Sequence, residues 1–85
     1  MTDHPSLWQG KSVLITGGAG GMGLAFAERF HAAGASLALA DIDQARLAQA
    51  VKTFAPDCLT IPSDVTRVED CSRMVSETLA RFGRL

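Results

Sequence analysis

The sequence predicts an α/β fold, a parallel sheet built from alternating strands and helices in the order β-α-β-α-β-α. Short apolar runs bounded by Gly, Pro or Asp alternate with segments of helical period. Strands joined by helices of this length run parallel, with right-handed crossovers. At 85 residues the chain is one small domain or part of one. We therefore expect residues 1–85 to form the N-terminal part of a domain, namely the first half of a doubly wound sheet.

The first strand and the first helix are separated by a glycine-rich turn. Residues 13–16 form a β-branched run of the kind that is buried on both faces of a sheet. A helix is expected over residues 22–33, with Phe26 and Phe30 on its buried side. Gly34 follows at the position of a left-handed C-terminal cap. These signals predict a strand–turn–helix unit.

A second strand and helix follow, and then a third strand. The second strand is expected over residues 36–40 and the third over residues 58–61, where it stops at Pro62. Asp43 is placed to cap the intervening helix with its side chain. The apolar positions of that helix follow the i, i+3, i+4, i+7 pattern: Leu47, Ala50, Val51 and Phe54.

The last helix carries the signature of a capping box. Thr66 is expected to accept a hydrogen bond from the Glu69 amide, while the Glu69 side chain reaches back to the Thr66 amide. Gly83 is expected to end the helix. Its expected buried face consists of Val68, Cys71, Val75, Leu79 and Phe82.

The composition excludes several classes of protein. Apolar residues make up 47% and charged residues 20% of the chain, which is incompatible with a disordered, charge-solvated tail. A net charge of -1 leaves no basic surface for nucleic acid. Cys58 and Cys71 are too few for a disulfide scaffold and lack the spacing of metal ligands, so no metal site is expected. No run is long and apolar enough for a membrane span, and the N-terminus lacks the pattern of a signal peptide, so a soluble, cytoplasmic chain is expected.

The glycine-rich turn at residues 16–23, with the sequence TGGAGGMG, has the composition of a phosphate-binding loop. It lies between a strand and a helix, where backbone amides and the positive end of the helix dipole bind a pyrophosphate. The segment fits both G-x-G-x-x-G and T-G-x-x-x-G-x-G, and such a pattern alone is weak evidence. However, Asp41 follows the loop by about 20 residues, at the end of the second strand, as a ribose-binding carboxylate does.

Asp41 also predicts which dinucleotide is bound. Asp43 is the better candidate for the helix cap, which leaves Asp41 free to accept hydrogen bonds from a ribose diol. A carboxylate here repels a 2′-phosphate, and the neighbouring Gly20 and Ile42 offer no cation to offset that repulsion. The residues therefore favour NAD over NADP as the cofactor.

Several short motifs occur in one order along the chain. They are Gly10-Lys11, Thr16-Gly17-x-x-x-Gly21-x-Gly23, Asp41, Asp64-Val65 and Phe82-Gly83-Arg84-Leu85. In this combination the chain, from about Leu7 onward, resembles the N-terminal portion of a short-chain dehydrogenase/reductase of the simple, non-extended type. The resemblance implies a Rossmann-type sheet and a dinucleotide-binding domain of which residues 1–85 are the N-terminal part. It also implies that the full-length form exchanges a hydride between NAD(H) and an alcohol or carbonyl substrate.

The resemblance implies a cofactor-binding set: Gly17, Gly21, Met22, Gly23, Asp41, Ile42, Asp64 and Val65. Its three glycines would line the pyrophosphate, and Asp41, with Ile42 beside it, would bind the adenosine ribose. Asp64 would accept a hydrogen bond from the adenine amino group, with the Val65 backbone next to it. Met22 stands where the family more often has Ile. From the residues alone, Asp64 is also explained as a charge at a helix N-terminus.

The catalytic residues that the resemblance implies are not in this sequence. The family's chemistry needs a Tyr with a Lys four residues later, and a Ser that polarises the carbonyl, yet the chain contains no Tyr. Lys11, Lys52 and His31 are expected to be solvated or structural and do not replace that pair. We assign no catalytic residue and expect the 85-residue chain itself to be inactive, although the family is one of NAD-dependent oxidoreductases.

The predicted sheet has an exposed edge. In the strand order 3-2-1-4 that the resemblance implies, the strand at residues 13–16 is central. Without a fourth strand it becomes an unpaired apolar edge, which is a site for pairing with another chain. We therefore expect self-association through this edge.

Two alternative functions remain open. One is a non-catalytic nucleotide-binding or interaction module that binds a partner through the exposed edge. The other is an S-adenosylmethionine-dependent methyltransferase domain, which shares the glycine loop and an acidic residue after the second strand. Thr16-Gly17 and Asp64-Val65 argue against the methyltransferase.

Overall fold

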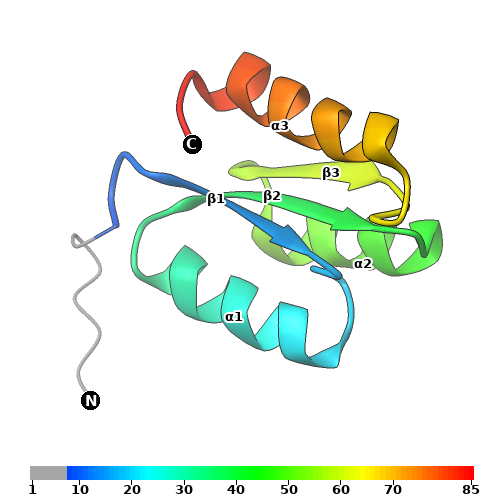
Figure 1. Ribbon diagram of the computed structural model, residues 1–85. Helices are drawn as coiled ribbons and strands as arrows, with labels where there is room; N and C mark the ends of the chain where they lie inside the picture. The colour runs from blue at the N-terminus through cyan, green and yellow to red at the C-terminus, as the bar shows by residue number, and fades with distance from the viewer. Residues whose placement is uncertain (1–7) are drawn as a thin grey trace.

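The chain folds into three layers, with a parallel sheet between two layers of helices (Figure 1). The computed structural model describes residues 8–85. Its elements are β1 (Ser12–Thr16), α1 (Gly21–Ala32), β2 (Ser36–Asp41), α2 (Gln44–Phe54), β3 (Cys58–Pro62) and α3 (Val68–Phe82). This order confirms the prediction from the alternation of apolar runs and helical periods. Residues 1–7, which bear on the expectation about a signal peptide, lie outside the described residues.

β2 lies at the centre of the sheet, between β1 and β3, and both pairs of strands are parallel. Val13 pairs with Leu37 in the first ladder, and Leu37 pairs with Cys58 in the second. Residues 37–40 of β2 are all buried. A strand with a neighbour on each side and helices over both faces has no exposed surface, which explains its continuous apolar sequence.

The two faces of the sheet form two separate cores. α1 and α2 cover one face and α3 covers the other (Figure 1). The first core contains Ala19, Ala27, Leu37, Leu39, Leu47, Ala50, Phe54 and Cys58. The second core contains Ala38, Ala40, Ile61 and Met74. The leucines of β2 therefore face α1 and α2, and its alanines face α3, as alternate residues of a strand do. None of the helices within residues 8–85 is long and apolar enough to cross a membrane.

Two signals at helix ends are confirmed. Gly34, which follows α1, has a left-handed φ of 97°. Asp43 is the N-cap of α2, and its carboxylate accepts a hydrogen bond from the Arg46 amide at 3.1 Å. Both features depend on residues within a single turn, so the sequence predicts them directly.

Helix α1 packs small residues against the sheet. Gly23 and Ala27 are its buried residues, whereas Phe26, expected on the buried side, is 52% exposed. The small residues let the helix lie close to the sheet, and Phe26 lies roughly 100° around the helix from Ala27. Phe30 is partly buried and packs edge-on against Trp8, with the ring centroids 4.9 Å apart.

The predicted capping box of α3 does not form. The N-cap is Arg67 rather than Thr66, and no side chain caps this end of the helix. The Thr66 hydroxyl instead donates a hydrogen bond to Asp64 Oδ1 at 2.6 Å, in the turn after β3. Glu69 and Asp70 still place negative charge in the first turn, where the helix dipole favours it.

The buried face of α3 also differs from the predicted one. Met74 and Thr78 are its buried residues, with 2% and 0% of their surface exposed. The Thr78 hydroxyl donates to the Met74 carbonyl at 2.7 Å, so its burial leaves no unpaired group. Most of the predicted stripe is exposed: Val68, Cys71, Val75 and Leu79. Phe82 packs at the margin of the second core. A helical period locates an apolar stripe but does not show which element covers it.

β1 is the edge strand of the sheet, as expected, because β2 is its one neighbour among the described strands. Its central residues, Val13, Leu14 and Ile15, are partly buried rather than buried on both faces. The prediction from the apolar run that both faces are buried was wrong, because a strand at the edge of the sheet is covered less completely than the central β2. The outer side of β1 therefore presents backbone groups without a ladder partner in residues 8–85.

Met74→Ala is expected to lower the free energy of unfolding by about 2–5 kcal/mol, because the Met74 side chain fills the space between α3 and the sheet. Val75→Ala, at the next position, should cost less than about 1 kcal/mol because Val75 is 41% exposed. Urea denaturation followed by circular dichroism measures both values. Equal losses in the two variants would contradict this assignment of the buried face.

Candidate functional site

The carboxyl ends of the three parallel strands lie at the same end of the sheet, where they surround a shallow hollow of about 170 Å³. We refer to it as the strand-end hollow. It is lined by Gly17, Ala40, Asp41, Ile42, Ser63, Asp64 and Val65. The structure thus brings together the residues predicted after all three strands. Open parallel sheets bind their ligands at this position.

The glycine loop between β1 and α1 has the geometry of an anion site. Gly17 has a φ of 65°, which residues with a side chain rarely adopt. The Gly20 amide donates to the Gly17 carbonyl at 3.1 Å and closes the turn. Gly20 is the N-cap of α1 and provides no side-chain cap, so the first-turn amides at residues 21–23 have no partner within the helix. With the helix dipole, these amides favour a phosphate.

Gly23 allows α1 to touch the loop. A Cβ on Gly23 would overlap the Gly17 carbonyl oxygen and lie 2.8 Å from Gly18 Cα. Both are backbone atoms, so a side chain at this position would force the loop and the helix apart. Gly23 therefore sets the position of the first-turn amides by close packing.

Asp41 joins the glycine loop to α2. Its Oδ2 accepts a hydrogen bond from the Ala19 amide at 3.2 Å, and its Oδ1 accepts one from the Asp43 amide at 2.9 Å. As expected, Asp43 and not Asp41 caps α2, but Asp41 also makes these two structural hydrogen bonds, which the sequence does not predict. Each carboxylate oxygen can accept a second hydrogen bond, so capacity for ribose hydroxyls remains.

Asp64 is held in its turn by Thr66. Asp64 Oδ1 accepts hydrogen bonds from the Thr66 hydroxyl at 2.6 Å and from the Thr66 amide at 2.9 Å. The hydroxyl bond and then the amide bond lower the pKa of Asp64 below its usual value, and the charge of Arg67 adds to this. Asp64 is therefore ionised at neutral pH. Because both bonds are made by Oδ1, Oδ2 keeps its capacity to accept a hydrogen bond from a ligand.

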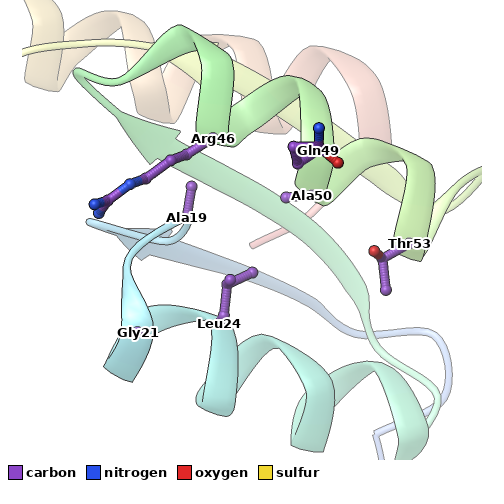
Figure 2. Close-up of a pocket in the computed structure, with 7 residues that line it drawn as sticks. All are labelled: Ala19, Gly21, Leu24, Arg46, Gln49, Ala50 and Thr53. Carbon is purple, nitrogen blue, oxygen red and sulfur yellow. The ribbon is translucent and has the colours of Figure 1, made fainter.

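A second hollow lies between α1 and α2, next to the glycine loop (Figure 2). This α1–α2 hollow has a volume of about 420 Å³ and is lined by Ala19, Gly21, Leu24, Arg46, Gln49, Ala50 and Thr53. Arg46 extends from α2 past Ala19 toward the loop, and its Nη1 lies 3.8 Å from where a Cβ on Gly20 would be. The sequence does not predict this approach, because it depends on how α2 packs beside α1.

Three predicted cofactor residues do not line the strand-end hollow. Gly21 lines the α1–α2 hollow, the Met22 side chain is exposed, and Gly23 packs against the backbone of the glycine loop. All three belong to the first turn of α1, so each can contribute its backbone amide. The predicted set also lacks the Ala19 amide and Ser63, a buried residue of the strand-end hollow whose hydroxyl donates to the Ile61 carbonyl at 2.8 Å. The place of Ser63 directly after β3 is a signal that could have found it.

Neither cysteine lines the strand-end hollow or the α1–α2 hollow. Cys58 lies in the first core, and burial raises the pKa of its thiol to about 11 against the opposing charge of Arg81. A thiol that stays protonated is a poor nucleophile. Cys71 is exposed, with its sulfur 3.4 Å from the Val65 carbonyl oxygen. No group of three His, Cys, Asp or Glu side chains within residues 8–85 is placed to hold a metal ion.

Gly23→Ala is expected to destabilise the fold by about 1–3 kcal/mol, since the added Cβ meets loop backbone. Gly21→Ala is the matched control, because no atom lies within 4 Å of its added Cβ. Its free energy of unfolding should be unchanged or slightly higher, since Ala is favoured over Gly in a helix. Thermal unfolding compares the two variants. A Gly23→Ala variant as stable as the wild type would show that the loop does not need this close contact.

The sequence is similar to curated dehydrogenases. It is 42% identical to the L-fucose dehydrogenase of Bos taurus over 78 residues, which are 92% of this chain and 28% of that protein. It is also 42% identical to the cis-2,3-dihydrobiphenyl-2,3-diol dehydrogenase of Paraburkholderia xenovorans over 77 residues, which are 91% of this chain and 28% of that protein. The chain thus spans 28% of the length of these curated relatives.

Solved structures and a sequence family show the same relationship. A short chain dehydrogenase/reductase from Burkholderia phymatum, in complex with NAD, matches with a TM-score of 0.88 and 31% identity, over 100% of this chain and 30% of that one. The 3-ketoacyl-(acyl-carrier-protein) reductase from Brucella melitensis, complexed with NADH, matches with a TM-score of 0.87 and 30% identity, over 91% of this chain and 32% of that one. The sequence model of the family described as short chain dehydrogenase matches residues 11–85. Because this match includes both the glycine loop and the strand-end hollow, the chain belongs to the short-chain dehydrogenase family.

Proposed function

We propose that this chain is the part of a short-chain dehydrogenase that holds the adenosine half of NAD(H). Its full-length form would exchange a hydride between NAD(H) and an alcohol or carbonyl substrate. The observation that carries the proposal is that two carboxylates, Asp41 and Asp64, meet the glycine loop at the carboxyl ends of the strands, and that this loop leads into an uncapped helix N-terminus. Similar solved structures with bound NAD or NADH support it.

Each part of the site suits one part of the cofactor. The first-turn amides of α1 can donate to the pyrophosphate. Asp41 can accept hydrogen bonds from the ribose hydroxyls, and Asp64 Oδ2 can accept one from the adenine amino group. Ile42 and Val65, which are exposed and line the same hollow, offer apolar contact to the adenine ring. When bound, the nicotinamide supplies the hydride chemistry, while these residues hold the opposite end of the molecule.

The chain itself supplies binding rather than catalysis in this proposal. It contains no Tyr, so the Tyr and Lys pair of the family's chemistry is not among its residues. The 85-residue chain should therefore bind the cofactor without turning over an alcohol or a carbonyl compound.

Asp41→Ala is expected to weaken NAD binding by at least about tenfold, because a hydrogen bond to a charged group contributes about 1.5–3 kcal/mol. Isothermal titration calorimetry with NAD measures the change. Circular dichroism of the variant is needed beside it, since Asp41 also bonds to the Ala19 amide.

The control for this variant is Asp57→Ala. It removes the same charge at the other end of β3, before the strand begins, and should leave NAD affinity unchanged. Unchanged affinity in a folded Asp41→Ala variant would contradict the ribose assignment. Failure of the wild-type chain to bind NAD would overturn the proposed function.

We also propose that the outer edge of β1 pairs with β1 of a second copy of the chain. β1 has β2 as its one partner in residues 8–85, so its outer backbone groups are free to extend the sheet. Two identical edges can pair about a two-fold axis. α3 contacts β1 and carries the exposed apolar residues Val75 and Leu79, which a second copy would cover.

Sedimentation equilibrium at micromolar concentration is expected to give a mass near twice the 9.0 kDa of the chain. Leu79→Lys should weaken the dimer by about tenfold, because it places a charge in an apolar contact. Ala80→Lys adds the same charge at the next, exposed position of α3 and should weaken the dimer less. A chain that stays monomeric at all concentrations would contradict the pairing.

A further inference from the structure

Arg46 brings a positive charge to the glycine loop from α2. The neighbours of Asp41 in the sequence and in the loop, Ile42 and Gly20, carry no charge. Those residues alone therefore indicate strong exclusion of a phosphate on the ribose 2′-oxygen. In the structure, however, Arg46 Nη1 lies 3.8 Å from where a Cβ on Gly20 would be, and Figure 2 shows the side chain reaching past Ala19.

The inner part of the Arg46 side chain is held by Asp43. Arg46 Nε lies 3.4 Å from Asp43 Oδ2, and the Arg46 amide donates to Asp43 Oδ1 at 3.1 Å. Because Nε makes this ion pair, Nη1 at the far end of the guanidinium is the atom that approaches Gly20. The Arg46 side chain is 61% exposed, so a ligand in solvent can reach it.

The guanidinium and the ribose-binding carboxylate flank the same piece of the loop. Asp41 Oδ2 accepts a hydrogen bond from the Ala19 amide at 3.2 Å, and Gly20 is the next residue. A ribose bound to Asp41 would therefore have residues 19 and 20 as neighbours, in the part of the loop that Arg46 approaches. A phosphate on its 2′-oxygen would meet the repulsion of Asp41 and the attraction of Arg46 together.

We propose that Arg46 is a specificity-determining residue, whose charge offsets the repulsion by Asp41 so that the site admits NADP as a second, weaker cofactor. This inference rests on the proposed function. A guanidinium suits a phosphate because its N–H groups form paired, charge-assisted hydrogen bonds. Since Arg46 is exposed and partly neutralised by Asp43, solvent screening limits its effect to about three- to tenfold in NADP affinity.

The test compares the ratio of the dissociation constants for NADP and NAD in the wild type and two variants. Arg46→Gln removes the charge and leaves the cap of α2 in place, because that cap uses the backbone amide. Lys52→Gln removes the same charge from the last turn of the same helix, away from the loop. Isothermal titration at low ionic strength measures binding directly, and circular dichroism establishes that each variant is folded.

Arg46→Gln is expected to raise the NADP-to-NAD ratio about three- to tenfold by weakening NADP, with little change for NAD. Lys52→Gln should keep the wild-type ratio. Added salt should reduce the difference in this ratio between the wild type and Arg46→Gln, because it screens the Arg46 charge, whereas its screening of Asp41 acts on both proteins alike. Should Arg46→Gln not fold, Arg46→Met gives the same comparison, because it also removes the exposed charge.

The outcomes separate this inference from the proposal beneath it. NAD binding with an unchanged ratio in folded Arg46→Gln overturns the role of Arg46 and leaves the proposed function intact. An equal shift in Lys52→Gln also overturns it, because the effect would then come from net charge. A difference between the wild type and Arg46→Gln that salt does not reduce has the same consequence. Failure of the wild type to bind NAD overturns the proposed function, and the role of Arg46 with it.

Discussion

The contact between α1 and the glycine loop at Gly23 is the constraint on which the site depends. Since Gly23 has no side chain, the start of the helix comes against the backbone of Gly17 and Gly18. The loop must then turn sharply, and Gly17 does so with a φ of 65°. That turn carries the Ala19 amide to the Asp41 carboxylate at the end of β2. The contact at Gly23 and the Asp41 carboxylate therefore fix the loop, the central strand β2 and the start of α2 relative to one another.

Features that depend on neighbouring residues could be predicted from the sequence. The cap at Asp43 and the left-handed Gly34 each depend on one turn of chain. The order of strands and helices follows from apolar patterns within each segment, and the parallel direction follows from the length of the connections. Asp41 and Asp64 come together because the ends of parallel strands share one edge, so even this long-range proximity could be inferred.

Features that depend on packing between elements could not be predicted in the same way. The apolar residues of α3 mark a stripe, yet Met74 and Thr78 beside that stripe are the ones that meet the sheet. The Thr66 hydroxyl donates to the Asp64 carboxylate in the turn, and the helix has its N-cap one residue later, at Arg67, than the capping box requires. The approach of Arg46 to Gly20 depends on the distance between two helices, which no short pattern encodes.

Trp8 lies at the end of α1 opposite the glycine loop. It is the single tryptophan of the chain, its amide donates to the Ala33 carbonyl at 3.1 Å, and its ring packs against Phe30. The helix between them has 12 residues and a length of about 18 Å. The indole is therefore a fluorescent probe at the C-terminal end of α1, far from the glycine loop. A tilt of the whole helix would change its fluorescence, whereas a rearrangement confined to the loop would leave its emission spectrum as it is.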